Sequence, residues 1–347
     1  MGNAGDGAAP RPTLEMVAAE AGVSRGTASR ALNGGHSVSR HALEAVEAAA
    51  EKLGYRPNLA ARSLVLGRTG SVGLVVSETD ERLFSDPYFA SVSRAVHAEL
   101  LRHDVQLVLA LAQSSSERER MLRFAAGRHL DGVIIISVHG QDPLPAAIAA
   151  AGLPVVIGGA VEGPDRELDR IASVDADNRV GAQAAVEHLV RGGRRRVAHI
   201  AGPLDMIVSR DRLSGWRTVA GRTAGGAGGT LTEPGEFSEA SGAAALRRLL
   251  EREPDLDAVF CANDLMARGA IGALRAAGRR VPDDVAVVGF DDLPGADLGE
   301  PALTTVRQPV HAMGRLMAKT LLDMVNGRVP DPRHVVVETR LVVRDSA

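Results

Sequence analysis

The chain has 347 residues, a length typical of two or three domains, and its hydrophobic residues are mainly aliphatic because only 3% of all residues are aromatic. The single cysteine, Cys261, excludes an internal disulfide framework, and its apolar surroundings in the sequence predict a buried thiol. The formal net charge of −3 is unevenly distributed along the chain, because residues 11–68 carry eight Arg or Lys against five Glu. A small basic segment attached to an acidic body predicts nucleic-acid contact at one end only.

The chain opens with a segment rich in Gly, Ala and Pro, and we expect residues 1–12 to form a disordered tail. The sequence has no hydrophobic signal segment, and no apolar run in it is long enough to span a membrane. We therefore expect a cytoplasmic protein without a membrane partner.

Residues 13–57 have the pattern of a helix-turn-helix DNA-binding domain. Apolar residues at i, i+3, i+4 and i+7 predict a first helix, and Gly22 can take the positive φ that often ends a helix. Ser24 is a suitable N-cap for a second helix. Ser39 is a suitable N-cap for a third helix, which we expect to stop at Gly54. The alternative is an ordinary three-helix bundle without a DNA partner.

Polar side chains on the second predicted helix are suited to phosphates and base edges. We expect Arg25, the first residue after the cap, to pair with guanine O6 and N7 in the major groove, because Gly26 beside it has no side chain. This predicts a palindromic, GC-rich double-stranded DNA operator. The candidate DNA-binding residues of this domain are Thr13, Ser24, Arg25, Thr27, Ser29, Arg30 and Asn33.

Two motifs, GVSRGTASRALN and YRPNLAARSL, resemble the lactose-repressor (LacI/GalR) family of bacterial transcriptional regulators. The resemblance implies that residues 58–70 are a hinge helix and linker, which enters the minor groove of the operator together with the hinge of a second subunit. It places Asn58 at a phosphate-contacting cap, Ala61 at a close hinge contact and Leu64 at the position of a wedge between bases. The alternative is a linker with an incidental leucine.

From Ser71 onward, apolar runs alternate with helical patterns, which indicates parallel sheets covered by helices on both faces. Two such series predict two Rossmann-like lobes that bind a ligand beyond the strand C-termini. The predicted strands are 72–76, 105–109, 133–136, 155–157, 197–201, 258–261 and 285–289, and predicted helices include 87–103, 117–129, 178–191 and 265–277.

The resemblance to the LacI/GalR family continues almost to the end of the chain. It implies an α/β fold class in which the helix-turn-helix head precedes a two-lobed, periplasmic-binding-protein-like domain for effector binding and dimerisation, residues 71–347. The expected N-lobe holds about 71–159 and 310–326, and the expected C-lobe holds about 160–301 and 334–343.

The family resemblance also implies a ligand cleft between the lobes. A pyranose needs a flat aromatic ring for its C–H face and planar bidentate groups for its hydroxyls. Asn263 could instead be only a helix cap, and Asp291 only part of a turn, while Trp216 is expected in the core. The candidate ligand-binding residues are Tyr88, Phe89, Arg212, Phe237, Asn263, Asp291 and Gln308.

Within the family, the phrases PTLEMVA, GVSRGT and IAGPLDM are similar to cellobiose-responsive repressors of cellulose utilisation. We therefore expect a sequence-specific DNA-binding transcriptional repressor whose operator affinity is controlled allosterically by a small carbohydrate, with cellobiose or a related β-linked glucose disaccharide as the expected inducer. An inverted-repeat operator also predicts a homodimer, with the helix 87–103 as a candidate interface.

The sequence disfavours two other classes of protein. A periplasmic-type sugar-binding protein is disfavoured by the missing signal segment and by the helix-turn-helix pattern. An enzyme is disfavoured because we find no nucleophile–base set, P-loop or metal-spaced cluster, so we expect no cofactor and no metal. The glycine-rich run Gly225–Gly229 does not fit a dinucleotide fingerprint and is expected to be a loop.

Overall fold

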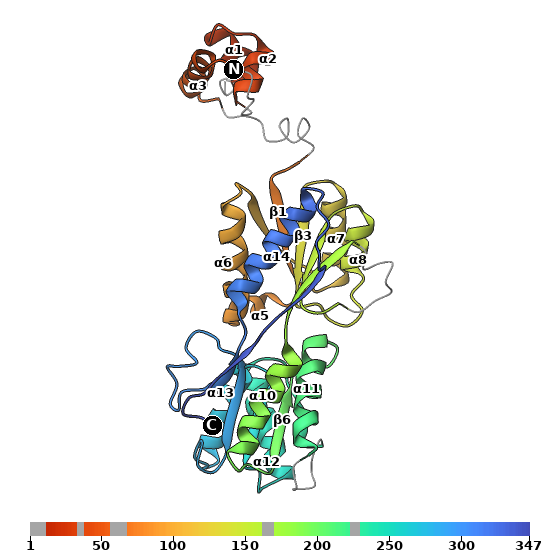
Figure 1. The fold of residues 1–347 in the computed structure, drawn as a ribbon, viewed down its shortest axis with the longest axis vertical. Coiled ribbons are helices and arrows are strands. Elements are labelled where there is room, and N and C mark those ends of the chain that lie inside the picture. The colour runs from red at the N-terminus through yellow and green to blue at the C-terminus, as the bar shows by residue number, and fades with distance from the viewer. Residues whose placement is uncertain (1–11, 33–37, 56–67, 162–169, 223–229) are drawn as a thin grey trace, which may run out of the picture. The chain divides into compact units, whose positions relative to one another are not determined.

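The computed structural model describes residues 12–32, 38–55, 68–161, 170–222 and 230–347 (Figure 1). The chain divides into two compact units, Met1–Thr69 and Gly70–Ala347. Several sequence predictions lie outside the described residues and stay predictions: the tail at 1–11, the glycine-rich loop, Asn33, Asn58, Ala61 and Leu64.

The N-terminal unit contains a three-helix cluster built around small and branched side chains. Val17, Ala28 and Val46, one from each helix, are completely buried. Ala28 occupies little volume, so the helices can approach each other closely at this point. The helices are α1 (Leu14–Glu20), α2 (Arg25–Leu32) and α3 (Arg40–Leu53).

The ends of these helices follow the predicted capping chemistry. The Ser39 hydroxyl accepts a hydrogen bond of 3.3 Å from the Ala42 amide at the start of α3. Gly54 has a φ of 63° at the end of α3, and Gly22 has a φ of 65° after α1. These left-handed values favour glycine, so the predicted helix boundaries are confirmed.

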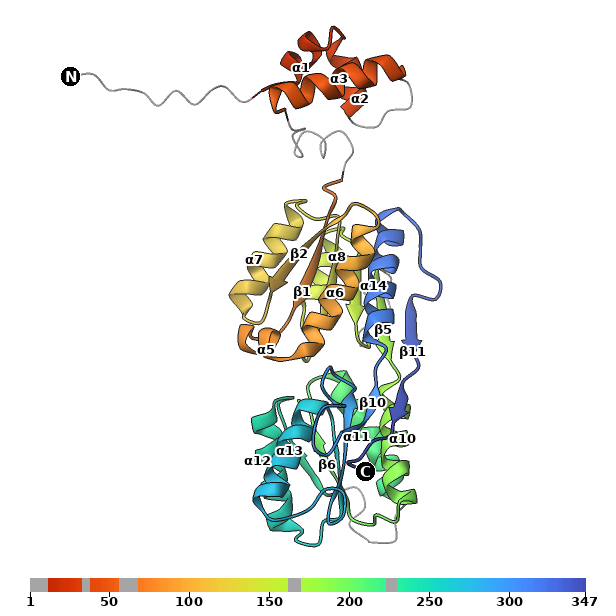
Figure 2. The ribbon, with the colours of Figure 1, turned by 90° about the vertical axis from the view of Figure 1, so that its left-hand side faces the viewer.

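The C-terminal unit consists of two lobes, each with a six-stranded sheet (Figures 1 and 2). The strand order is β11-β5-β4-β3-β1-β2 in the first lobe and β12-β10-β9-β8-β6-β7 in the second. Among the described strands, all pairs are parallel except β10 with β12. This confirms the α/β fold class with parallel sheets.

The first lobe contains β1 (Ser71–Val76), α5 (Asp80–Ser85), α6 (Pro87–Leu101), β2 (Gln106–Leu111), α7 (Ser115–Ala126), β3 (Gly132–Ile136), α8 (Leu144–Ala150), β4 (Val155–Gly158), β5 (Ile171–Ala176), α14 (Val310–Val325) and β11 (His334–Val337). The second contains α10 (Asn178–Arg191), β6 (Val197–Ala201), α11 (Ile207–Ala220), β7 (Thr232–Pro234), α12 (Glu239–Arg252), β8 (Ala258–Cys261), α13 (Asp264–Ala276), β9 (Ala286–Asp291), β10 (Thr304–Arg307) and β12 (Arg340–Val342). Within the described residues, each strand and helix that the sequence predicted is present, within a few residues at either end. The predicted hinge helix lies outside these residues.

Helices cover both faces of each sheet, which explains why the central strands are continuously apolar. In the first lobe, α6 and α14 pack together on one face, and α7 and α8 on the other. In the second lobe, α12 and α13 cover one face, and α10 and α11 the other. Trp216 and Cys261 are completely buried in the second lobe, as predicted.

The predicted lobe boundaries require a correction. Residues 171–176 and 334–337 fall in the ranges expected for the C-lobe, but they form β5 and β11 in the sheet of the first lobe. β5 pairs in parallel with β4, with Val155 opposite Ile171, and β11 then pairs in parallel with β5. The terminal strands are therefore divided between the lobes, because β12 alone pairs with β10 in the second sheet. The pairing of strands far apart in sequence decided this assignment.

Candidate ligand cleft and nucleic-acid interface

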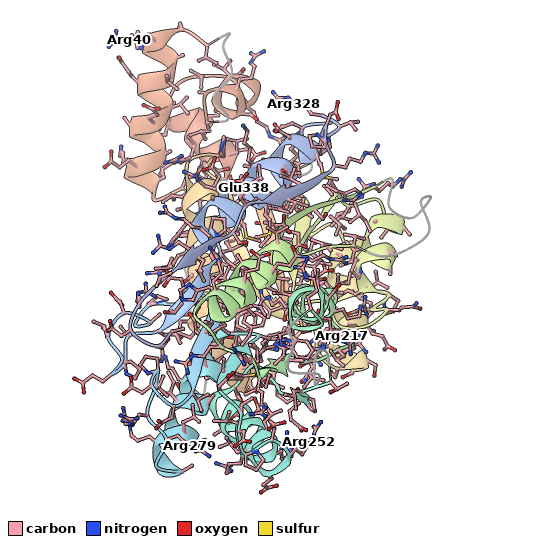
Figure 3. The ribbon with its side chains drawn as sticks, turned by 60° about the horizontal axis from the view of Figure 1, so that its bottom comes forward. Arg40, Arg217, Arg252, Arg279, Arg328 and Glu338 are labelled. Carbon is pink, nitrogen blue, oxygen red and sulfur yellow. The ribbon has the colours of Figure 1, made fainter. Side chains whose placement is uncertain are left out.

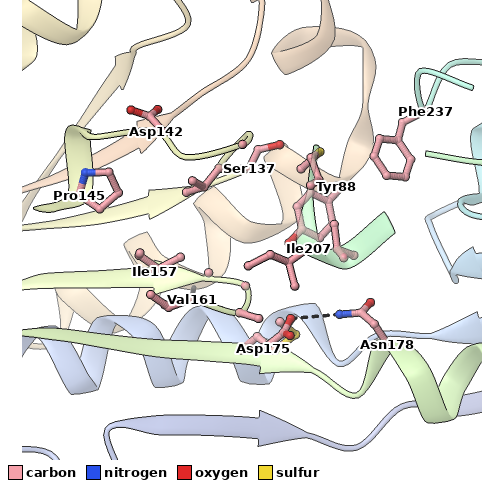
Figure 4. A pocket seen from close by; sticks show the side chains of 18 of the residues that line it. Tyr88, Ser137, Asp142, Pro145, Ile157, Val161, Asp175, Asn178, Ile207 and Phe237 are labelled. Atoms are coloured by element: carbon pink, nitrogen blue, oxygen red, sulfur yellow. Dashed lines mark hydrogen bonds between the residues drawn. The ribbon is translucent and has the colours of Figure 1, made fainter. Parts of the chain in front are cut away.

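A cavity of about 720 Å³ lies between the two lobes of the C-terminal unit (Figure 4). Its walls come from both sheets near the ends of their strands, where parallel α/β folds usually bind ligands. The structure brings all seven predicted ligand residues together in its lining: Tyr88, Phe89, Arg212, Phe237, Asn263, Asp291 and Gln308.

Arg212 is held in place by contacts with other residues of the protein. Its Nε donates to Asn178 Oδ1 at 3.0 Å, and its Nη1 donates to the carbonyl of Ala262. Its guanidinium lies 3.8 Å from the centre of the Phe290 ring and pairs with Asp291 at 3.5 Å. The side chain is 4% exposed, unlike surface arginines such as Arg217 (Figure 3). A buried, pre-positioned guanidinium is suited to planar recognition of a polar ligand.

Asp291 is the last residue of β9 and has a φ of 112°, a left-handed value that is costly for a residue with a side chain. Gln308 donates to its carboxylate from Nε2, and burial raises the pKa of Asp291 although Arg212 opposes this. Asp292, which follows the strand, has a φ of 56° and pairs with Arg307 at 2.6 Å. Asp291 itself lines the cavity, where its carboxylate can accept hydrogen bonds.

Asn263 is the N-cap of α13, which was the alternative interpretation of this residue. Its Oδ1 accepts a hydrogen bond from the Met266 amide at 2.9 Å, and its Nδ2 donates to the carbonyl of Phe237 at 3.0 Å. Phe237 has a φ of 54°, so this hydrogen bond helps to hold a strained backbone. Asn263 therefore positions Phe237 at the cavity wall.

Tyr88 and Phe89 lie in the first turn of α6, whose N-cap is Asp86. The Asp86 carboxylate accepts a hydrogen bond from the Tyr88 amide at 2.9 Å. The Tyr88 and Phe89 rings meet edge to face with centroids 5.5 Å apart. Phe89 is 1% exposed and belongs mainly to the core, whereas the partly buried Tyr88 presents its ring to the cavity (Figure 4).

Sequence reasoning missed several polar residues of this cavity, including Arg82, Ser137 and Asp175. Asp175 is the penultimate residue of β5, and burial raises its pKa to about 6. Its carboxylate accepts a hydrogen bond from Asn178 Nδ2 at 3.1 Å (Figure 4). Arg82 in α5 stacks on Phe237, with 4.8 Å between its guanidinium carbon and the ring centroid. Asp175 could have been found from its place at the end of a strand, but β5 was not predicted.

The N-terminal unit presents the predicted DNA-binding residues that are described. Thr13 caps α1, because its hydroxyl accepts a hydrogen bond from the Met16 amide at 3.4 Å. Ser24 caps α2 by accepting from the Thr27 amide at 3.1 Å. Arg25 is 72% exposed and pairs with Glu15 at 2.8 Å. Ser24 and Arg30 are exposed, and Thr27 and Ser29 are partly buried. This unit therefore presents a polar α2 surface to solvent.

None of the helices in the described ranges is long and apolar enough to cross a membrane. Two parts of the sequence each match a known protein family. Residues 13–58 match the bacterial regulatory proteins of the lacI family, and residues 186–347 match a periplasmic binding protein-like domain.

Relatives match the chain over nearly its whole length. The HTH-type transcriptional regulator CelR of Thermobifida fusca is 48% identical over 336 residues, which cover 97% of this chain and 98% of that protein. A solved complex of transcriptional regulator CelR with cellobiose has a TM-score of 0.76, with 46% identity, and covers 97% of this chain and 100% of its own.

A lac repressor dimer bound to operator and the anti-inducer ONPF has a TM-score of 0.84 at 27% identity, and covers 97% of this chain and 99% of its own. These relatives are regulators of transcription rather than enzymes. The chain therefore belongs to the lacI family of bacterial regulatory proteins and is a DNA-binding transcriptional regulator.

Proposed function

We propose that this regulator is a repressor whose affinity for its operator is controlled by a small carbohydrate bound in the cleft between the lobes. The observation that carries the proposal is the arrangement of Tyr88, Phe237, Arg212 and Asp291 around one cavity of about 720 Å³. The two aromatic rings suit the C–H faces of a sugar, and the guanidinium and carboxylate suit its hydroxyls. The solved cellobiose complex of a relative supports cellobiose, or a related β-linked glucose disaccharide, as the effector.

Each cleft residue has a proposed role that follows from its surroundings. Arg212 donates to vicinal hydroxyls from a guanidinium that Asn178 already orients. Asp291 accepts from hydroxyls, while Gln308 donates to its Oδ1 and so orients the carboxylate. Tyr88 and Phe237 stack on the sugar, and Asn263 acts chiefly by fixing Phe237.

We propose that Arg25 reads a guanine in each half-site of a GC-rich palindrome. Its ion pair with Glu15 is exposed, so exchanging Glu15 for a guanine edge costs little. Thr13, Ser24 and Arg30 contact phosphates or neighbouring bases in this proposal. Asn58, Ala61 and Leu64 form the hinge contacts, a role that rests on the sequence resemblance.

A two-fold operator also calls for a homodimer acting where the chromosome lies, in the cytoplasm. The lac repressor dimer among the similar structures supports this assembly. Because a ligand shifts a population only by its differential affinity, the sugar is proposed to favour one lobe arrangement and thereby act as inducer.

A thermal-shift screen of mono- and disaccharides tests the effector. A sugar present at about 100 times its Kd should raise stability by about 2.7 kcal/mol. The same sugar should then release a fluorescent operator in an anisotropy titration. A screen in which cellobiose and related disaccharides neither stabilise the protein nor change operator affinity would contradict the proposed effector class.

A further inference from the structure

A histidine joins the two lobes of the C-terminal unit at the edge of the cleft. His139 follows β3 in the first lobe, and its Nε2 lies 3.0 Å from Glu78 Oε1, just after β1. Its Nδ1 lies 2.9 Å from Asp205 Oδ2, which follows β6 in the second lobe. Beside this bridge, the Gly140 amide donates to the carbonyl of Asp205 at 3.0 Å. The chain Glu78–His139–Asp205 therefore crosses between the lobes.

The two contacts of His139 require a particular charge. A carboxylate only accepts hydrogen bonds, so a ring nitrogen facing a carboxylate must donate one. A neutral imidazole has a single N–H and can satisfy only one of the two carboxylates, whereas an imidazolium donates to both. The bridge observed here is complete only when His139 is protonated.

We propose that His139 is a positioning residue for the effector, whose imidazolium holds the two lobes together around the bound sugar and whose neutral form weakens that closure. The inference rests on the proposed sugar cleft, because the sugar is the ligand that the lobes would enclose. Opening of the lobes separates Asp205 from His139 but leaves the contact with Glu78 inside the first lobe.

The bridge is also connected to the cleft wall. Glu78 is 7% exposed, pairs with Arg82 and accepts a hydrogen bond from Ser137. Arg82 in turn stacks on Phe237, which belongs to the second lobe. Two contacts between the lobes therefore involve partners of the buried Glu78 carboxylate. One is the contact of His139 with Asp205, and the other is the stacking of the Arg82 guanidinium on Phe237.

The surroundings of His139 give the direction of its titration. The hydrogen bond to Glu78 raises the pKa of His139 above its ordinary value of 6.5, burial opposes this, and Asp205 raises it further. Loss of Asp205 on opening removes part of this increase. Protonation therefore favours closure, so sugar affinity should be greatest below the pKa of the open state and should fall as pH rises through the pKa of the bridged state.

Other ionisable groups titrate near this bridge and need a matched control. Burial raises the pKa of Asp175 to about 6 and also raises the pKa of Asp291, and both line the cleft. The test must therefore compare variants rather than rely on the pH profile of the wild type. Charged groups that line the adjoining cavity with His139 are Glu78, Glu81, Arg82, Asp86, Arg118, Asp142 and Glu236, and Arg210 approaches the backbone of Asp205.

Calorimetric titration with cellobiose between about pH 5.5 and 8.5 tests the proposal, in two buffers that differ in ionisation heat. A difference of about one pKa unit between open and bridged states would lower wild-type affinity about tenfold across this range and give proton uptake on binding. His139→Gln and Asp205→Asn should both reduce the pH slope and the proton uptake. His129→Gln, at an exposed histidine of the same lobe, should retain both.

A second measurement does not depend on the sugar. In the proposal the free protein already populates the bridged arrangement part of the time, and the sugar increases that population. The imidazole pKa of His139, followed by NMR in the free protein, should therefore be lower in Asp205→Asn than in the wild type. An unchanged pKa in Asp205→Asn, or an unchanged pH slope in His139→Gln, would overturn the bridge. Failure of the wild type to bind cellobiose at any pH, with the NMR difference present, would instead contradict the proposed effector and retain the bridge.

Discussion

Arg212 and Arg25 carry the same guanidinium in opposite surroundings. Arg212 is buried among the side chain of Asn178, a backbone carbonyl and the Phe290 ring, so its position is fixed by the fold. Arg25 is 72% exposed, and its ion pair with Glu15 contributes little to stability. A fixed guanidinium suits a small ligand held in one orientation, whereas an exposed one can exchange its partner for a base edge.

Arg25→Ala should cost about 1–3 kcal/mol of binding free energy per half-site and should relax the preference at one base pair. The reason is the loss of bidentate pairing to guanine, which alanine cannot replace. Binding to a randomised operator library would measure both effects. Arg40→Ala is the matched control, because Arg40 is also exposed and paired, with Glu44 at 3.0 Å in α3. Unchanged base preference in the Arg25 variant would remove this residue from the recognition surface.

At the scale of elements, close backbone contacts between helices set the packing of the second lobe. A Cβ added at Gly269 in α13 would lie 1.9 Å from the carbonyl oxygen of Glu239 in α12. A Cβ at Gly242 in α12 would lie 2.2 Å from the carbonyl oxygen of Met266. The two helices therefore touch through glycine at both places, and neither backbone carbonyl can move aside without moving its helix.

Gly269→Ala should lower the free energy of unfolding by about 1–3 kcal/mol or more, because overpacking a core usually costs this much. Gly272→Ala is a control in the same helix, because no atom beyond the neighbouring residues and backbone of that helix lies within 4 Å of its added Cβ. It should raise stability by about 0.5–1 kcal/mol, since alanine favours the helix more than glycine does. Thermal or urea unfolding measures both. Equal effects of the two substitutions would show that the α12–α13 contact is not tight in solution.

At the scale of the whole molecule, DNA recognition and ligand binding lie in separate compact units. The sugar can therefore control the operator only through a shift between conformations, which thermodynamic linkage makes reciprocal. The factor by which the sugar weakens operator binding must equal the factor by which the operator weakens sugar binding. This requirement is independent of the path that connects the two units.

Calorimetric titration of the sugar into free and operator-bound protein should give affinities that differ by this factor, with weaker sugar binding on the operator. Arg212→Ala should still bind operator but should no longer release it, because it lacks the fixed guanidinium of the cleft. Arg217→Ala, an exposed position in the same helix, should behave as the wild type. Identical sugar affinity with and without operator would contradict the proposed allosteric control.

The sequence by itself determined the features that depend on neighbours along the chain. The caps at Ser24 and Ser39, the left-handed Gly54 and the apolar strands such as β3 all follow from local chemistry. The family motifs added seven cleft residues, and the fold brings all of them to one cavity. The predicted caps, backbone conformations and strands are confirmed because these features involve residues a few positions apart along the chain.

Only the tertiary structure decided the features that join distant segments. The membership of β5 and β11 in the first sheet depends on pairings such as Ser173 with His334. The role of Asn263 as a cap that also holds Phe237, and the bridge from His139 to Asp205, depend equally on where the chain returns. No local pattern specifies such pairs, because their geometry is fixed by the packing of whole strands and helices against one another.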